Sequence, residues 1–224
     1  MTVYDNLTYV KQQIEEACKK TNRSPGEITI VAVTKTVGIE KAKEVLNAGI
    51  VHLGENRKEG LLPKYEAFGD KVHWHFIGSL QTRKVKDVID KIDYLHSLDR
   101  LSLAEEIQKR ATKPVRCFVQ VKTSHEETKH GLEPDEVLSF ITSLEKYDKI
   151  RIIGLMTMAP YSQDDAEIRR CFRALRKLKD EIQALHFVHA PCTELSMGMS
   201  NDYAIAIEEG ATYIRLGTIL VGNE

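Results

Sequence analysis

Strand-like apolar runs alternate with amphipathic helical stretches along the whole chain, and this alternation constrains the fold more than any other feature. The run from Ile28 to Thr34 is almost uninterrupted by polar residues, as in a strand that is covered on both faces. A helical stretch follows and ends at Gly49, a suitable residue after a helix C-terminus. The pattern then repeats, with further strand-like segments at about 50–53, 73–77, 94–96, 115–121, 150–155, 193–195 and 211–216.

This alternation predicts an α/β fold with a parallel sheet. Eight strand–helix units in 224 residues favour a single compact (β/α)₈ TIM barrel. An open, doubly wound sheet is the main alternative. The apolar stripe from Val3 to Ala17 predicts one extra helix before the first strand. No low-complexity linker interrupts the pattern, so we expect one domain over residues 1–224.

Charge and cysteine content exclude several classes of partner. Lys plus Arg is 32 and Asp plus Glu is 33, so the net charge of −1 gives no reason to expect nucleic acid or an acidic membrane. No apolar stretch approaches the ~20 residues that span a bilayer, and the N-terminus does not resemble a signal peptide. The cysteines form no CxxC pair, which favours reduced thiols in a cytoplasmic protein: Cys18, Cys117, Cys171 and Cys192.

Lys35 lies at the end of the first strand, where a barrel of this type places its active site. If the apolar run desolvates this lysine, its pKa falls and the neutral amine becomes a nucleophile toward carbonyl groups. The alternative is a lysine whose stem packs on the rim while its charged head stays in water.

The last two strands end in segments that favour a phosphate site. Such sites in barrels are often built by the loops after strands seven and eight, here 195–200 and 217–218. Glycines allow close approach of an anion, and hydroxyls and N–H groups donate to it. The segment Ser200-Asn201-Asp202 is also expected to cap the next helix, and ordinary turn glycines and caps are the alternative to a phosphate site. Strand alternation directs Arg215 inward, although a salt bridge to another strand residue could explain it equally.

His73 and His75 share one face of a predicted strand and could be metal ligands, but no third ligand has convincing spacing. We therefore expect histidines satisfied within the barrel or at its rim, and no metal.

The motifs together resemble the pyridoxal phosphate homeostasis protein family, whose fold is like the barrel domain of bacterial alanine racemase. The resemblance extends over nearly the whole chain in the segments IVAVTK (30–35), LGEN (53–56), WHFIGSLQ (74–81), GLMT (154–157), ELSMGMSND (194–202) and RLGT (215–218).

The resemblance implies that Lys35 holds pyridoxal 5′-phosphate (PLP) as a Schiff base. It also implies that Ser196, Gly217 and Thr218 hold the phosphate with help from the Met197 backbone. Arg215 would face the pyridine nitrogen. The remaining implied members of the pocket are Asn56 near the ring, Met156 in the wall and, less centrally, His75.

An arginine beside the pyridine nitrogen cannot accept its proton, so PLP would be a weak electron sink. Only a short segment follows the last strand, so we expect no second, racemase-type domain, an open pocket and a monomer. These features favour a protein for PLP homeostasis that supplies apoenzymes transiently, rather than an efficient enzyme. A weak PLP-dependent racemase is the alternative, and a cofactor-free Schiff-base aldolase is a third.

Overall fold

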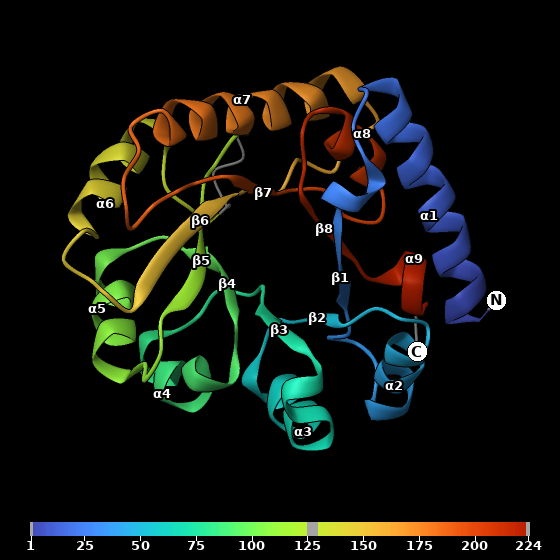
Figure 1. Cartoon of the computed structure of the whole chain (residues 1–224), viewed down its shortest axis with the longest axis horizontal. Coiled ribbons are helices and arrows are strands. Elements are labelled where there is room, and N and C mark those ends of the chain that lie inside the picture. The colour runs from blue at the N-terminus through green and yellow to red at the C-terminus, as the bar shows by residue number, and fades with distance from the viewer. Residues whose placement is uncertain (1, 125–129, 223–224) are drawn as a thin grey trace.

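The computed structural model describes residues 2–124 and 130–222, and in these ranges eight parallel strands close into a barrel in the order of the chain (Figure 1). Strand β8 pairs with β1, which closes the sheet. The barrel confirms the predicted fold class and excludes the open sheet. The strands are β1 (Thr29–Val33), β2 (His52–Glu55), β3 (His73–Phe76), β4 (Tyr94–Leu98), β5 (Val115–Gln120), β6 (Ile150–Met156), β7 (Glu194–Ser196) and β8 (Tyr213–Leu216).

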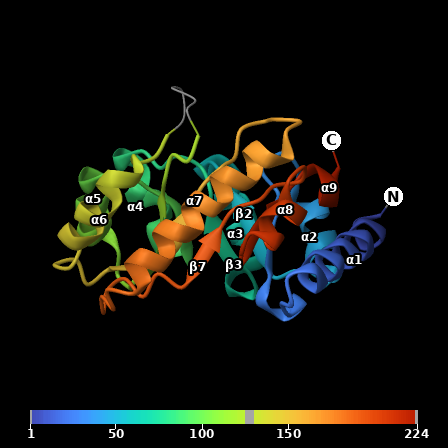
Figure 2. The same cartoon turned by 90° about the horizontal axis from the view of Figure 1, so that it is seen from above.

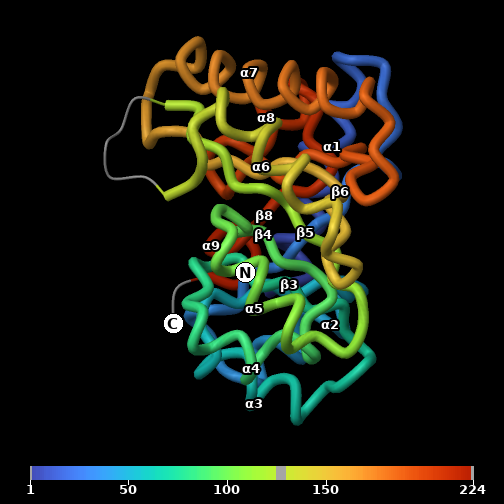
Figure 3. Tube along the Cα trace, turned by 90° about the vertical axis from the view of Figure 1, so that its left-hand side faces the viewer, coloured from blue at the N-terminus to red at the C-terminus, as the bar shows by residue number. Residues whose placement is uncertain are grey.

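Helices surround the strands. Figure 3 shows α7 and α8 on one side of the barrel and α3 and α4 on the other. The short helix after β8 was not anticipated from the sequence. The helices are α1 (Val3–Lys20), α2 (Ile39–Asn47), α3 (Lys58–Phe68), α4 (Val85–Val88), α5 (Leu101–Arg110), α6 (Val137–Ser143), α7 (Asp165–Gln183), α8 (Tyr203–Glu208) and α9 (Thr218–Val221).

Helix α1 is the predicted extra helix. Thr2 and Asp5 form a reciprocal capping box at its start, which satisfies backbone donors that a helix leaves unpaired. Its apolar stripe is buried, and it lies along α8 and α9 (Figure 2). The Asn6 side chain donates a hydrogen bond to the Leu220 carbonyl at 2.9 Å. This contact ties the first helix to the last, beside the barrel.

Apolar side chains form two separate layers. The larger layer fills the space between strands and helices, and it includes Cys117 and Cys192. The smaller layer lies inside the barrel and consists of Tyr94, Phe118, Ile153 and Met156. Burial on both faces explains why the strands read as continuous apolar runs.

Two glycines allow neighbouring strand ends to approach. A Cβ at Gly78 would lie 2.2 Å from the Asn56 carbonyl oxygen, and one at Gly154 would lie 2.0 Å from the Glu194 carbonyl oxygen. Any larger residue would force the backbone apart at these two points. Gly78 therefore lets the end of β3 pack against the end of β2, which positions Asn56.

None of the helices in the described ranges has the length and apolar character needed to cross a membrane. All four cysteine thiols are buried.

Candidate functional site

Several of the predicted site residues lie at the rim formed by the C-terminal ends of the strands. Lys35 follows β1, Asn56 follows β2 and Gly217 follows β8. Ala32 of β1 is in register with Leu216 of β8, so the segments after these two strands are adjacent. Residues that are far apart in the sequence are therefore brought to one end of the barrel.

Lys35 is exposed in the turn after β1. The sequence left two alternatives for this lysine, an amine desolvated by the apolar strand or a rim residue with its charged head in water, and in the structure burial ends at Thr34, one residue earlier. The strand buries its own side chains, whereas Lys35 lies beyond the last strand residue, Val33. The amine is thus accessible at the rim, which agrees with the alternative of a lysine whose charged head stays in water.

Arg215 points into the barrel, as strand alternation predicted. It is 5% exposed, and it donates hydrogen bonds to Ser196 Oγ at 2.5 Å and to the Thr157 carbonyl at 2.9 Å. Within the described ranges no carboxylate lies at ion-pair distance from it, so its partners are neutral. Burial lowers the pKa of the guanidinium to about 10, while Asp202 acts in the opposite direction. Arg215 therefore remains a cation at neutral pH.

Ser196 and Met197 were expected to contact a phosphate, but both residues are buried. Ser196 is fully buried in β7, and its hydroxyl contacts His96 and Arg215. The Met197 N–H donates to the Tyr213 carbonyl at 3.1 Å, and its side chain belongs to the layer between strands and helices. Sheet pairing thus occupies the Met197 N–H that a phosphate was expected to use. Met156, by contrast, lies inside the barrel.

A set of donors beside Ser196 is more accessible. Thr218 is exposed, and Gly217 and Ser200 are half-buried. Asp202, the last residue of the expected cap segment, is the N-cap residue of α8, and Ser200 Oγ accepts a long hydrogen bond from the Ile219 N–H at 3.5 Å. Ser200 therefore bridges the two loops that were predicted to hold a phosphate.

His75 is buried inside the barrel, below the rim, and belongs to a row of three histidines. His52 Nδ1 lies 2.9 Å from His75 Nε2, and His75 Nδ1 lies 2.9 Å from His96 Nε2. His96 Nδ1 lies 2.8 Å from Ser196 Oγ. His75 thus reaches the rim only through His96 and Ser196. We refer to His52, His75 and His96 as the histidine row.

Burial holds the histidine row neutral. It lowers the pKa values of His75 and His96 well below their usual range. The electrostatic interaction of His75 with His96 lowers the pKa of His75 further, and the charge of Arg215 lowers the pKa of His96 further. Burial, followed by His73, lowers the pKa of half-buried His52 to about 4. Sequence reasoning missed His52 and His96, although each occupies an inward position on a strand next to His75 in the barrel.

A buried ion pair anchors the backbone just before Lys35. Lys64 Nζ donates to Glu55 Oε1 and to the Thr34 carbonyl, both at 2.6 Å. Thr34 Oγ1 also donates to Glu55 Oε1 at 2.6 Å. These three residues connect β1, β2 and α3 behind the rim. No sequence signal marked Lys64, because its burial depends on where α3 packs.

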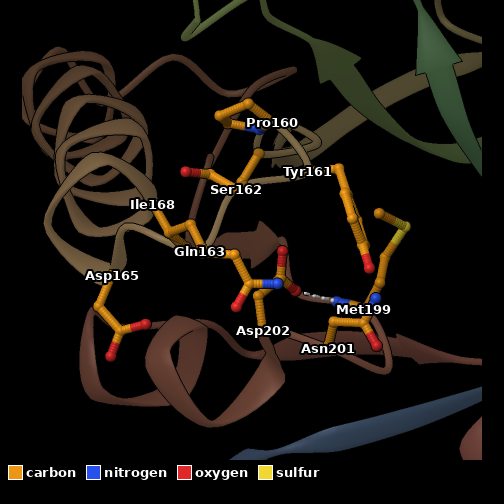
Figure 4. Close-up of a pocket in the computed structure, with 10 residues that line it drawn as sticks. Pro160, Tyr161, Ser162, Gln163, Asp165, Ile168, Met199, Asn201 and Asp202 are labelled. Carbon is orange, nitrogen blue, oxygen red and sulfur yellow. Dashed lines mark hydrogen bonds between the residues drawn. The ribbon is translucent and has the colours of Figure 1, made fainter.

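A pocket of about 350 Å³ opens beside the rim, between the loops that follow β6 and β7 (Figure 4). Tyr161, Gln163, Met199 and Asp202 are among its lining residues, and the Met199 N–H donates to Asp202 at 2.6 Å. None of the residues predicted for cofactor binding lines it. Asn56 lines a different depression, together with Gly78 and Ser79.

Across residues 2–124 and 130–222, no three His, Cys, Asp or Glu side chains are grouped so that they could hold a metal ion. The rings of His73 and His52 lie 4.7 Å apart, but they are not part of such a group.

Comparisons with known proteins cover the whole barrel. Residues 6–224 match the model of the family described as alanine racemase, N-terminal domain. A pyridoxal phosphate homeostasis protein of Aquifex aeolicus is 42% identical over 227 residues, which cover 100% of this chain and 99% of that protein. A protein of the same name from Haemophilus influenzae is 32% identical, over 99% of this chain and 96% of its own.

Solved structures agree with these matches. PipY of Synechococcus elongatus, solved with PLP bound, superposes with a TM-score of 0.87 at 30% identity, covering 99% of this chain and 100% of that one. Alanine racemase of Corynebacterium glutamicum has a TM-score of 0.76 at 13% identity, covering 97% of this chain and 59% of the racemase, and it shares the fold. By sequence and by structure, the chain belongs to the pyridoxal phosphate homeostasis protein family, built on the alanine racemase N-terminal domain.

Proposed function

We propose that this protein binds PLP at the barrel rim as a Schiff base on Lys35, and that it serves intracellular PLP homeostasis and PLP supply rather than efficient catalysis. The observation that carries this proposal is the accessible Lys35 in the turn after β1, the strand that pairs with the one before the Gly217–Thr218 loop. When bound, PLP supplies an aldehyde for the lysine amine and a ring that can accept electrons.

The rim fits the phosphate of such a ligand. A Cβ at Gly217 would meet only Val33, at 3.7 Å, which is an ordinary contact. No protein neighbour therefore requires glycine at this position, whereas close approach of a phosphate oxygen would. Ser200 and Thr218 offer hydroxyl donors on either side. We assign the phosphate contacts to Gly217, Thr218 and Ser200, and not to Ser196 or Met197.

Arg215 supports storage of PLP over catalysis. A guanidinium has only donors, so it can hold a pyridine nitrogen through the lone pair but cannot receive a proton from it. The nitrogen stays unprotonated, and stabilisation of a carbanion by the ring is weak. Thr157 and Ser196 fix two donor groups of Arg215 below the rim. Asn56 and Met156 are the proposed neighbours of the ring.

Borohydride reduction after incubation with PLP should add the mass of PLP to Lys35, and digestion should locate the label on that residue. Lys35→Arg keeps the charge and should remain unlabelled. A chase with a PLP-scavenging apoenzyme before reduction should remove the label, because a carrier releases its ligand. An unchanged intact mass would refute the attachment, and label that survives the chase would refute the supply role.

Ser200→Ala and Thr218→Ala should each weaken PLP retention about tenfold, because a hydrogen bond to a charged group contributes roughly 1.5–3 kcal/mol. Thr193→Ala, which alters an exposed threonine at the opposite end of β7, is the matched control and should retain PLP normally. Equilibrium dialysis measures all three. Retention that is unchanged in the Ser200→Ala, Thr218→Ala double variant would place the phosphate elsewhere.

A further inference from the structure

The histidine row connects the two ends of the barrel. His52 lines a shallow cleft beside Ile30 and Val51, at the N-terminal ends of the strands. From there the hydrogen bonds lead through His75 and His96 to Ser196 and end at Arg215. Every link joins two side chains on different strands, and each heavy-atom separation is 2.9 Å or less.

The direction of this chain of hydrogen bonds follows from Arg215. A guanidinium cannot accept a hydrogen bond, so Ser196 Oγ must accept from Arg215. In the described part of the chain the only other side-chain partner of Ser196 Oγ is His96 Nδ1. If His96 Nδ1 carried a hydrogen, the buried Ser196 hydroxyl would have no acceptor, which costs about 1–3 kcal/mol. Ser196 therefore donates to His96 Nδ1.

The same logic passes along the row, because a neutral imidazole has one donor and one acceptor nitrogen. His96 carries its hydrogen on Nε2 and donates to His75 Nδ1. His75 then carries its hydrogen on Nε2 and donates to His52 Nδ1. All three rings are in one tautomer, and in each ring the acceptor nitrogen, Nδ1, is on the side nearer Arg215 along the row.

We propose that the histidine row is a tautomer-locked support that keeps Arg215 charged and oriented toward the rim without a carboxylate partner. Each bond dipole presents its negative end toward the guanidinium, which stabilises a buried cation. A carboxylate in this place would neutralise Arg215 more strongly, whereas a neutral row leaves its positive charge available to a ligand. Ser196, His96, His75 and His52 are thus positioning residues. The role of Arg215 toward the pyridine nitrogen rests on the proposed function; the direction of the row does not.

Nitrogen-15 NMR of the protein as purified, without PLP, reports the tautomer of each histidine directly. We expect His75 and His96 to carry hydrogen on Nε2 alone. Ser196→Ala removes the link to Arg215, so both rings should become mixtures of tautomers. Exchange of the Arg215 side-chain hydrogens with water should accelerate about tenfold or more, since a bond to a charged group has been lost.

Ser196→Thr keeps the hydroxyl and should restore the single tautomer, which separates positioning from a general loosening of the barrel. His186→Asn changes an exposed histidine that has no ring contact with the row among the described residues, and it should leave the tautomers unchanged. An Nδ1–H form of His75 or His96 in the unmodified protein, or unchanged spectra and exchange in Ser196→Ala, would overturn the proposal. Missing PLP label on Lys35 together with a single tautomer would refute the proposed function but leave the row intact.

Discussion

Acidification from about pH 7.5 to about pH 5.5 should lower the free energy of unfolding by about 3 kcal/mol through His75 and His96 alone. Both rings are buried, and their pKa values lie well below the ordinary value of 6.5. Below that value the unfolded chain binds a proton at each histidine and the folded chain does not. Each such proton reduces stability by about 1.36 kcal/mol per pH unit. The stabilisation is therefore complete above pH 6.5 and is lost as the pH falls.

The groups around the two rings reinforce this direction. Arg215 faces His96, while His52, His73 and Arg116 surround His75. The carboxylates of Glu208 and Glu209, which pair with Arg169, have pKa values below their ordinary 4.5. The stability that these ion pairs contribute is therefore lost only at a pH below the range of this experiment.

Urea unfolding at the two pH values measures the difference. His186→Asn, which alters an exposed histidine, should show the same loss as the unmodified protein, because the histidine row and the groups around it are intact in it. A free energy of unfolding that stays constant over this range would mean that the buried imidazoles take up protons in the folded state.

Lys64→Met should lower the free energy of unfolding by about 3–5 kcal/mol, the usual effect of removing one partner of a buried ion pair. Lys64 and Glu55 are 4% and 0% exposed, and Glu55 Oε2 already has no hydrogen-bond partner among the described residues. Without Lys64, the Glu55 carboxylate would be buried with only the Thr34 hydroxyl. The Thr34 carbonyl would also lose the shorter of its two hydrogen bonds and keep only the Val37 N–H at 3.2 Å, so the turn that carries Lys35 should loosen and PLP retention should weaken as well.

Lys58→Met is the matched control on the same helix. Lys58 pairs with Asp87 at 2.8 Å, but both side chains are about one-third exposed, and a pair of this kind contributes about 0–1 kcal/mol. Chemical denaturation compares the two variants. A Lys64→Met protein no less stable than Lys58→Met would show that water reaches Glu55 and that the pair does not anchor the turn.

The fold followed from local patterns in the sequence. Segments such as 115–121 and 150–155 are recognisable as strands because both of their faces are apolar, and α1 is recognisable from one apolar stripe. These patterns depend on spacing along the chain, which the sequence contains completely. The short helix α9 was missed because its four residues form only about one helical turn. A segment this short cannot show apolar residues repeating at the helical period.

The sequence also indicated which ends of the strands carry the site, since a parallel barrel brings all of its carboxyl ends together. This rule correctly places the residues that follow β1, β2 and β8 at the rim: Lys35, Asn56, Gly217 and Thr218. Strand alternation correctly directs Arg215 inward. The sequence did not indicate which groups each side chain contacts. Ser196 and Ser200 are four residues apart and chemically identical, yet one is buried in β7 and the other bridges two rim loops.

Only the tertiary structure decided these partners, because they depend on strand register and on which face of each strand points inward. His75 was paired with His73 by their spacing in sequence, whereas its actual partners are His52 and His96 on the neighbouring strands. Likewise, Lys64 is a buried anchor only because α3 packs behind β1 and β2. Patterns along the chain therefore determined the barrel and the end at which its candidate site residues lie, and contacts across the barrel determined what supports Lys35 and Arg215.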